Sequence, residues 1–600
     1  MMNTDLLKLY NERIKRFQSI AQSKNKQLKI LSLFRLFSFI SIFPAVYFLF
    51  PISTGLAICS ITVLLSLFLT LVKKYIKTEM ELQFHQNLVT INEDETKALN
   101  RDFQAFDSGT EFIDPQHDYS FDLDLYGKGS LFQFINRTVT FHGKKRLSAH
   151  LNLTQRSRKE IMMKQAAIRE LADKLDWRQD FLASKNSEDG PENQNQFSNI
   201  IQASTPLKRA EMLKHLVIGL PLATLFLIFI NIIGIDPFSF YKLAILAQLI
   251  ILGINIKTIL KFHSQFENQR KLLTQYTKML RYIENLSTED SYLNELKAKL
   301  RYNGKSASLI TSELEKLLNQ FDYSKNILIG FILDSIFLWD IKCIVRLNDW
   351  QKKYAAQLPL WFEVIAEFDA LISLSNLNYN HPSWVTPTVS KEEFQLSTVN
   401  VGHPLIDETR CVKNDFLMSP TDQITIITGA NMAGKSTFLR TIGVNLILAT
   451  NGCKVYAESF DFSPIRVYTN MRTSDNLIND ESYFYAELLR LQSILKHLKN
   501  GEKLFVIIDE MLKGTNSIDK LNGSKELIKQ LISLRTHGIV ATHDIGLTEL
   551  ASTYPEITNK CFEIDLNEND LSFSYKLTNG VTKTMNATFL MKKMGIIPQK

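Results

Sequence analysis

Four apolar runs dominate the hydropathy pattern of the chain, and they occur as two pairs. Each run is close to the roughly 20 residues that an α-helix needs to cross a bilayer, and a short turn separates the two runs of each pair. We therefore predict two transmembrane hairpins. The apolar runs cover residues 31–50, 55–72, 216–235 and 240–256, so that the hairpins have the bounds 31–73 and 216–256.

Polar residues weaken this prediction for the second pair. Lys242, Gln248 and Asn255 interrupt the fourth run, so a buried helical hairpin in a large soluble domain is the alternative there. A further apolar stretch, residues 327–339, is too short to cross a bilayer and contains Asp334. We interpret this shorter stretch as a core helix.

Basic residues flank the hairpins at their outer ends. Lys73, Lys74 and Lys77 follow the first pair, whereas neither connecting turn contains Lys or Arg. By the positive-inside rule, both ends of each hairpin face the cytoplasm. We expect a multi-pass protein of the cytoplasmic membrane whose N-terminus, helical core and C-terminal domain are cytoplasmic. The five scattered cysteines show no CxxC spacing, which argues against a disulfide framework or a zinc site and fits a reducing compartment.

The rest of the chain divides into segments by its pattern of apolar and polar residues. Its net charge of +7 is too small for 600 residues to indicate a nucleic-acid or membrane partner by itself. Amphipathic helical spacing continues to about residue 390, and short β-branched runs then alternate with helices, as in an α/β domain. The predicted segments are a basic N-terminal helix (1–30), the first part of a helical core (78–214), a helical lever or connector (262–390) and an α/β domain (391–600).

The α/β domain contains a glycine-rich loop between an expected strand, residues 423–428, and an expected helix, residues 438–448. The pattern G-x-x-x-x-G-K-S in this context predicts a phosphate-binding loop. Its backbone N–H groups would surround the phosphates of ATP, Lys435 would neutralise the β- and γ-phosphates, and Ser436 would ligate Mg²⁺. The predicted nucleotide-binding residues of the loop are Gly429, Ala430, Asn431, Met432, Ala433, Gly434, Lys435, Ser436 and Thr437.

Two later strands end in residues suited to ATP hydrolysis. The apolar strand at residues 504–508 is followed by Asp509 and Glu510, which could hold Mg²⁺ and polarise the attacking water, respectively. A third strand, residues 538–541, leads to His543, which could sense the γ-phosphate. We therefore predict Glu510 and His543 as catalytic residues and Ser436 and Asp509 as metal ligands.

These motifs resemble the MutS family of DNA mismatch repair ATPases. The loop reads GANMAGKSTFLR, close to that family's GPNMGGKST, and the segment after Glu510 is similar to the family's DE-x-x-R-G-T-S/N with Lys513 in place of Arg. The segment from Asp475 to Glu487 looks like the family's acidic residue followed by S-T-F-x-x-E, with Tyr483 in place of Thr. The resemblance implies that Ser482 contacts the nucleotide of the opposite subunit of a homodimer.

The resemblance continues upstream, with His403-Pro404 and Asn414-Asp415 at matching positions and Glu367 to Asp369 resembling a connector helix. The family's N-terminal mismatch-reading domain is not visible, and a membrane hairpin stands there instead. The chain thus resembles a shorter, membrane-associated branch of the family. A basic cluster could meet DNA phosphates, and a solvated helix face is the alternative. This cluster consists of Arg137, Lys144, Lys145, Arg146, Arg156, Arg158 and Lys159.

The expected fold is a C-terminal α/β P-loop NTPase domain, ABC-ATPase-like, preceded by a mainly α-helical core and lever region with two transmembrane hairpins. The resemblance implies an ATPase that uses ATP and Mg²⁺ at a dimer of P-loop domains and binds DNA, in mismatch repair or in recognition of unusual DNA structures at the membrane. Two alternatives are an ABC-type membrane transporter, which the missing LSGGQ segment disfavours, and a nucleotide-switched membrane scaffold without DNA binding.

Overall fold

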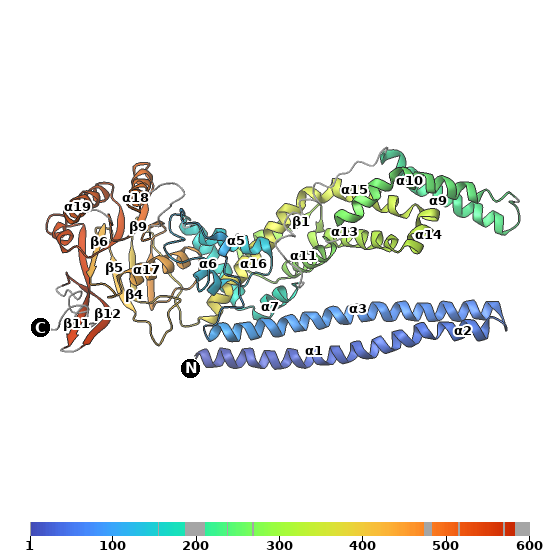
Figure 1. Cartoon of the computed structure of the whole chain (residues 1–600), viewed down its shortest axis with the longest axis horizontal. Coiled ribbons are helices and arrows are strands. Elements are labelled where there is room, and N and C mark those ends of the chain that lie inside the picture. The colour runs from blue at the N-terminus through green and yellow to red at the C-terminus, as the bar shows by residue number, and fades with distance from the viewer. Residues whose placement is uncertain are drawn as a thin grey trace.

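A computed structural model shows an elongated molecule with its larger sheets at one end and the turns of its most apolar helices at the other (Figure 1). The two predicted hairpins, far apart in the sequence, therefore extend toward the same end of the molecule. The structure describes residues 2–153, 155–185, 210–236, 238–266, 269–472, 483–513, 516–567 and 570–582.

The N-terminal hairpin consists of α1 (Met2–Ile40) and the short α2 (Ile42–Leu49), which return through α3 (Thr54–Leu99). Neither long helix is broken where the sequence analysis placed a segment boundary, at residue 30 or near residue 73. The reason is local, because α1 contains no Gly or Pro, and α3 contains none after Gly55. The basic N-terminal helix and the first apolar run are one continuous helix, packed along the length of α3.

The second hairpin consists of α9 (Ala210–Ile232) and α10 (Tyr241–Phe266). Among the described residues, four helical segments are long and apolar enough to cross a membrane, by length and composition alone, and between 6% and 17% of each apolar window is buried in the protein. Their number agrees with the predicted number of spans. The four segments are Thr4–Leu49, Thr54–Leu99, Met212–Ile232 and Tyr241–His263.

The interpretation of residues 327–339 as a core helix is wrong for one face of that segment. Residues Ile327–Phe337 do form a helix, α14, but Ile329, Phe331 and Ile332 are exposed, and the helix packs against α9 and α10 at the apolar end of the molecule. Length and the single Asp334 were insufficient to distinguish a helix inside the core from one at its surface.

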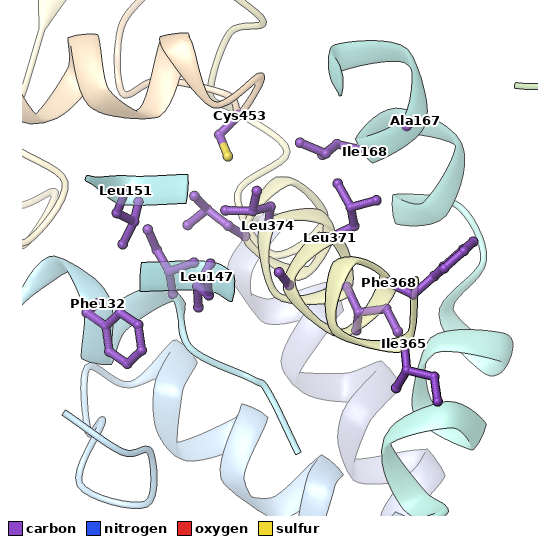
Figure 2. Close-up of a cluster of buried hydrophobic side chains, with 14 of the residues drawn as sticks. Phe132, Leu147, Leu151, Ala167, Ile168, Ile365, Phe368, Leu371, Leu374 and Cys453 are labelled. Atoms are coloured by element: carbon purple, nitrogen blue, oxygen red, sulfur yellow. The ribbon is translucent and has the colours of Figure 1, made fainter. Parts of the chain in front are cut away.

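The helical core surrounds α16 (Leu358–Asn380), which is buried along almost its whole length. Figure 2 shows α16 with α5 (Phe141–Leu151) and α6 (Arg158–Ala172) packed around it, and Cys453 of the C-terminal domain pointing into the same apolar cluster. One continuous core therefore joins the helical region to the C-terminal domain. The other core helices are α4 (Leu131–Ile135), α7 (Leu175–Ala183), α11 (Gln269–Glu284), α12 (Ser291–Ala298), α13 (Ala307–Phe321) and α15 (Trp339–Tyr354), with a small hairpin of β1 (Arg301–Tyr302) and β2 (Lys305–Ser306).

The C-terminal domain contains a six-stranded sheet in the order β12-β11-β6-β10-β9-β8 and a four-stranded sheet in the order β3-β7-β4-β5. The larger sheet is parallel except for β12, which is antiparallel to β11. Helices α17 (Lys435–Thr450), α18 (Tyr483–Lys499) and α19 (Ser517–Ser533) belong to this domain. The strands are β3 (Thr388–Val389), β4 (Leu396–Val401), β5 (Asn414–Met418), β6 (Ile424–Gly429), β7 (Ser459–Phe462), β8 (Arg466–Asn470), β9 (Leu504–Asp509), β10 (His537–Thr542), β11 (Ile557–Asn567) and β12 (Asp570–Asn579).

Candidate nucleotide-binding site

The register of the central strands brings the three predicted motifs to one edge of the sheet. Thr428 of β6 lies opposite Thr542 of β10, and Ala541 lies opposite Asp509 of β9. The strands are parallel, so the residues that follow them emerge at the same carboxyl edge. The glycine-rich loop, the Asp509-Glu510 pair and His543 therefore share this edge, which is where open α/β sheets bind their ligands.

The glycine-rich loop has the backbone that a phosphate cradle requires. Gly434 has φ +108°, a conformation that L side chains rarely adopt, and it directly precedes α17. The Nζ atom of Lys435 donates to the carbonyl oxygens of Gly429 and Ala430, at 2.6 and 3.0 Å. The side chain of Lys435 thus folds back over its own loop and faces the space where N–H groups at a helix N-terminus would bind phosphate.

Burial lowers the pKa of Lys435 to about 8, although Asp509 and Glu510 act in the opposite direction. A lysine in such a site gains most from an anionic ligand, because the ligand restores the favourable environment of the charged amine. Ser436 is half-buried in the first turn of α17, beside Lys435. The lysine, the serine hydroxyl and Asp509 form a donor set that fits ATP with Mg²⁺.

Glu510 follows β9 in a left-handed conformation with φ +62°, and its backbone N–H donates to Ala541. Lys520 of α19 donates from Nζ to Glu510 Oε1 at 2.6 Å. Burial alone would raise the pKa of the Glu510 carboxyl, but the hydrogen bond and charge of Lys520, with His543 and Lys513, hold it below its usual value. Glu510 is therefore an ionised carboxylate at neutral pH, as a water-polarising group must be.

His543 lies directly against the glycine-rich loop, with Nε2 3.3 Å from Nζ of Lys435. Burial lowers the pKa of the His543 imidazole, and the charge of Lys435 lowers it further. A neutral ring beside the loop can exchange a hydrogen bond with a phosphate oxygen without adding charge repulsion toward Lys435. The structure thus brings together Lys435, Asp509, Glu510 and His543, as the sequence predicted.

The predicted trans-acting residue Ser482 lies outside the described residues. The helix that follows it, α18, contains the buried Glu487, whose carboxylate accepts hydrogen bonds from the backbone N–H groups of Leu512 at 2.6 Å and Lys513 at 3.0 Å. Burial raises the pKa of Glu487. Glu487 therefore fixes the backbone that immediately follows the candidate base Glu510.

Sequence reasoning missed Lys520 and gave no role to Tyr575. The ring of Tyr575, 43% exposed, lies next to Gly434, since a Cβ atom on that glycine would be 3.2 Å from Tyr575 Cδ1. An exposed aromatic ring at the mouth of the loop offers a stacking surface for a nucleobase. No local signal marks either residue, because each reaches the site through the fold from a separate element.

The HP and ND motifs have structural roles. His403 Nδ1 accepts from the backbone N–H of Leu405, and burial lowers its pKa to about 4. Asn414 of β5 pairs with β12, donating to the carbonyl of Tyr575 at 3.0 Å and accepting from the N–H of Leu577 at 2.8 Å. The two motifs therefore stabilise turns and strand packing around the site.

The loop between α3 and α4 ties the helical core to the C-terminal domain. The buried carboxylate of Asp122 in this loop accepts from Thr469 Oγ1 at 2.6 Å and from the backbone N–H groups of Met471 and Arg472 at 3.0 and 2.9 Å. Arg490 of α18 approaches the same carboxylate at 3.3 Å. The loop is thus held directly to the end of β8 and to α18.

The basic cluster proposed for DNA phosphates is largely occupied by contacts within the chain. Arg137 pairs with Glu95 at 2.6 Å, and Arg146 pairs with Glu367 at 2.5 Å. The remaining contacts are those of Lys144 with Asp107 and Glu111, of Arg156 with backbone carbonyls that include that of Thr450, and of Arg158 with the carbonyl of Val389. Lys145 and Lys159 are exposed. Tertiary contacts thus occupy five of the seven side chains, and the contact of this cluster with DNA phosphates stays a prediction.

The C-terminal domain is similar in sequence to known proteins. Residues 425–600 match the family model described as MutS domain V. The chain is 31% identical over 239 residues to the DNA mismatch repair protein MutS of Thermotoga neapolitana, covering 38% of this chain and 28% of that protein. It is 26% identical over 363 residues to the DNA mismatch repair protein MutS of Thermotoga maritima, covering 56% and 44%, and 24% identical over 355 residues to the human MutS protein homolog 4, covering 57% and 36%. The chain thus spans less than half the length of each of these relatives.

Proposed function

We propose that the chain, whose residues 425–600 match the model of MutS domain V, is a membrane-anchored, DNA-binding ATPase of the MutS family that hydrolyses Mg-ATP as a homodimer. The observation that carries the proposal is the convergence of the glycine-rich loop, Glu510 and His543 at one carboxyl edge of the parallel sheet.

The residues divide the chemistry between them. Lys435 neutralises the transferred phosphoryl group, and Ser436 and Asp509 would hold Mg²⁺, which would supply further charge neutralisation. Glu510 orients the attacking water and accepts its proton, and His543 reports the γ-phosphate through its contact with Lys435. Ser482 of the opposite subunit completes the site, and Tyr575 stacks on the base. Hydrolysis would then depend mainly on positioning and electrostatics.

DNA is the proposed target because the similar proteins are described as DNA mismatch repair proteins. Glu95 and Glu367 pair with Arg137 and Arg146, so that of the exposed members Lys145, Arg146 and Lys159 one is already paired, and we place the main DNA contact elsewhere on the dimer. The membrane anchor is the pair of apolar hairpins, in which no more than 17% of each apolar window is buried inside the protein. Exposing so much apolar surface to water would be costly, and a bilayer removes that cost.

The test is ATP hydrolysis by the full chain in lipid nanodiscs, measured with homoduplex, mismatched and branched DNA and without DNA. We expect Mg²⁺-dependent hydrolysis that EDTA abolishes and a salt-sensitive stimulation by at least one DNA. Glu510→Gln should lower kcat by about 10²-fold or more while ATP binding persists. Hydrolysis indifferent to every DNA would contradict the DNA-binding part and favour a nucleotide-switched scaffold, and failure to hydrolyse ATP would overturn the proposal.

Mixed dimers test the action of Ser482 across the interface. Ser482→Ala and Lys435→Ala chains should each be inactive alone. Mixed in equal amounts, they should recover about one quarter of the wild-type activity, because half of the dimers then contain one complete site. No recovery, with dimer exchange verified by differently tagged chains, would mean that Ser482 does not act in trans.

A further inference from the structure

Helix α14 has its polar and apolar sides reversed relative to a helix of a soluble core. Ile329, Phe331 and Ile332 are 49%, 62% and 55% exposed, whereas Asp334 and Ser335 are buried. A helix that covers a water-soluble domain buries its apolar stripe and exposes its polar residues. The opposite arrangement is the one expected where the surrounding solvent is hydrocarbon.

The neighbours of α14 are the two helices of the second apolar hairpin. It packs against both α9 and α10, toward the end of the molecule where all four candidate spans turn (Figure 1). Both helices also carry exposed apolar side chains, among them Phe226 of α9, 63% exposed, and Ile250 of α10, 55% exposed. The same lipid that would cover α9 and α10 would also reach α14.

The C-terminal end of α14 has the backbone partners that a helix end needs in hydrocarbon. Gln248 of α10 is completely buried. Its side-chain amide is oriented so that the oxygen accepts a hydrogen bond from Thr224 Oγ1 at 2.6 Å. The amide nitrogen then lies 3.2 Å from the carbonyl oxygens of Ser335 and Ile336 and donates to them. A backbone carbonyl left without a partner is costly in hydrocarbon, where no water can pair with it. Gln248, which interrupts an apolar run in the sequence, thus joins three helices through hydrogen bonds.

Hydrogen bonds also pair the backbone groups of the turn after α14. The carboxylate of Asp334 accepts from the backbone N–H of Asp340 at 2.9 Å, and its carbonyl accepts from the N–H of Leu338 at 3.2 Å. The single acidic residue of α14 is therefore turned away from the exposed apolar face and used to start α15. Eleven residues at about 1.5 Å each extend roughly 16 Å, half of a hydrocarbon core of about 30 Å.

We propose that α14 is a membrane-inserted half-helix, whose face formed by Ile329, Phe331 and Ile332 contacts the acyl chains of the leaflet on the side of the C-terminal domain. The helix enters from α13 and leaves through α15 on the same side, since it is too short to cross. This inference rests on the proposed membrane anchoring and adds a fifth lipid contact. Because α15 leads directly into the buried α16, the inserted helix is connected to the core that packs on the ATPase domain.

The experiment uses depth-dependent quenching on the full chain in nanodiscs. Cys59 is the exposed native cysteine, so Cys59→Ser provides the background, and label on that background without an added cysteine is subtracted. Phe331→Cys, Phe226→Cys and Leu309→Cys are each labelled with an environment-sensitive maleimide fluorophore. Phe226 reports a candidate span, and Leu309, 59% exposed on α13, is the matched aqueous control. The quenchers are doxyl-labelled phospholipids and aqueous iodide.

We expect the label at residue 331 to be quenched by doxyl lipid as strongly as the label at residue 226 and to be shielded from iodide, with the reverse at residue 309. Lipid quenching at 226 together with aqueous behaviour at 331 would overturn the assignment of α14 and leave the membrane anchoring intact. Aqueous behaviour at both positions would overturn the anchoring itself. Ile332→Cys, on the same exposed face, repeats the measurement in case the first variant is poorly labelled.

Discussion

The Nζ atom of Lys520 lies 2.6 Å from Oε1 of Glu510, the carboxylate that directly follows the central strand β9. The lysine comes from α19, so this helix sets the charge state and the direction of the candidate base. The pair is partly open, with side-chain exposures of 22% and 28%, which leaves room for the carboxylate to engage water when nucleotide is bound.

Replacement of this lysine should shift the pH dependence of hydrolysis without abolishing activity. Lys520 lowers the pKa of Glu510, so Lys520→Met should move the acidic limb of kcat to higher pH. At pH 7.5, kcat should stay within about threefold of wild type, because a glutamate of ordinary pKa is still ionised there. Lys525→Met, on the same helix but paired with Glu549, is the control that should leave the profile unchanged. A loss as large as that of Glu510→Gln would instead give Lys520 a direct part in the chemistry.

ATP affinity should depend on pH through Lys435. Its pKa of about 8 in the free site means that the amine loses its charge as the pH rises through that value. Binding then requires proton uptake, so the Kd for ATP should rise by up to about tenfold per pH unit above 8. Isothermal titration in buffers of different ionisation enthalpy would measure both the Kd and the proton uptake. The Lys435→Arg protein, whose side chain stays charged, should bind ATP more weakly at pH 7, but its Kd should not rise above pH 8. Parallel curves of Kd against pH for the two proteins would show that Lys435 is not the titrating group.

A methyl group at residue 143 should destabilise the helical core. A Cβ atom there would lie 2.5 Å from Cγ of Asp369, whose carboxylate accepts from the backbone N–H groups of Val139 and Thr140 at the start of α5. Gly143→Ala must displace this carboxylate, so the free energy of unfolding should fall by about 2–4 kcal/mol, despite the higher helix propensity of alanine. Lys145→Ala, at an exposed position of the same helix, should change it by less than about 0.5 kcal/mol in urea unfolding. Equal effects of the two substitutions would contradict the close contact.

The loop that joins the helical core to the ATPase domain offers a matched pair of substitutions. The buried carboxylate of Asp122 accepts hydrogen bonds from two backbone N–H groups. An asparagine amide in its place would point its NH₂ group at one of these N–H donors and lose that hydrogen bond. Asp122→Asn should therefore cost about 2–4 kcal/mol of unfolding free energy and reduce kcat. Asp124, 44% exposed and paired with Arg472, lies two residues away, and Asp124→Asn should cost less than about 1 kcal/mol. Thermal unfolding followed by tryptophan fluorescence would distinguish them, and an undisturbed Asp122→Asn protein would contradict a role for this loop in coupling.

The geometry of the candidate nucleotide site was predictable because it follows from the order of its motifs along the chain. A strand, a glycine-rich loop and a helix in succession, followed by two strands ending in Asp509-Glu510 and His543, can be combined in a parallel sheet only with these residues at one edge. Lys520 and Glu487 were not predictable as partners of this edge, since their contacts depend on where α19 and α18 pack. The Asp122 contacts likewise join segments almost 350 residues apart.

The helical region was predicted less completely, for two physical reasons. Periodicity identifies apolar helices, but it does not say what covers them, so α14 was assigned to the core although its apolar face is exposed. Clustering of basic residues in the sequence likewise does not reveal their partners, and Arg137 and Arg146 proved to be paired with the buried carboxylates of Glu95 and Glu367. In both cases the deciding contacts are long-range.

In the proposed membrane-anchored state, the unbroken helix α3 would set the height of the C-terminal domain above the bilayer. Its 46 residues, at about 1.5 Å each, make a rod of roughly 69 Å, of which about 30 Å suffices to cross the hydrocarbon. The remaining length of α3, about 40 Å, would extend from the bilayer to the helical core. Copies anchored in the proposed way would carry their candidate nucleotide sites at one common height and would meet by diffusion in the plane of the membrane. Their pairing would then depend on surface density in the membrane rather than on concentration in the cell volume.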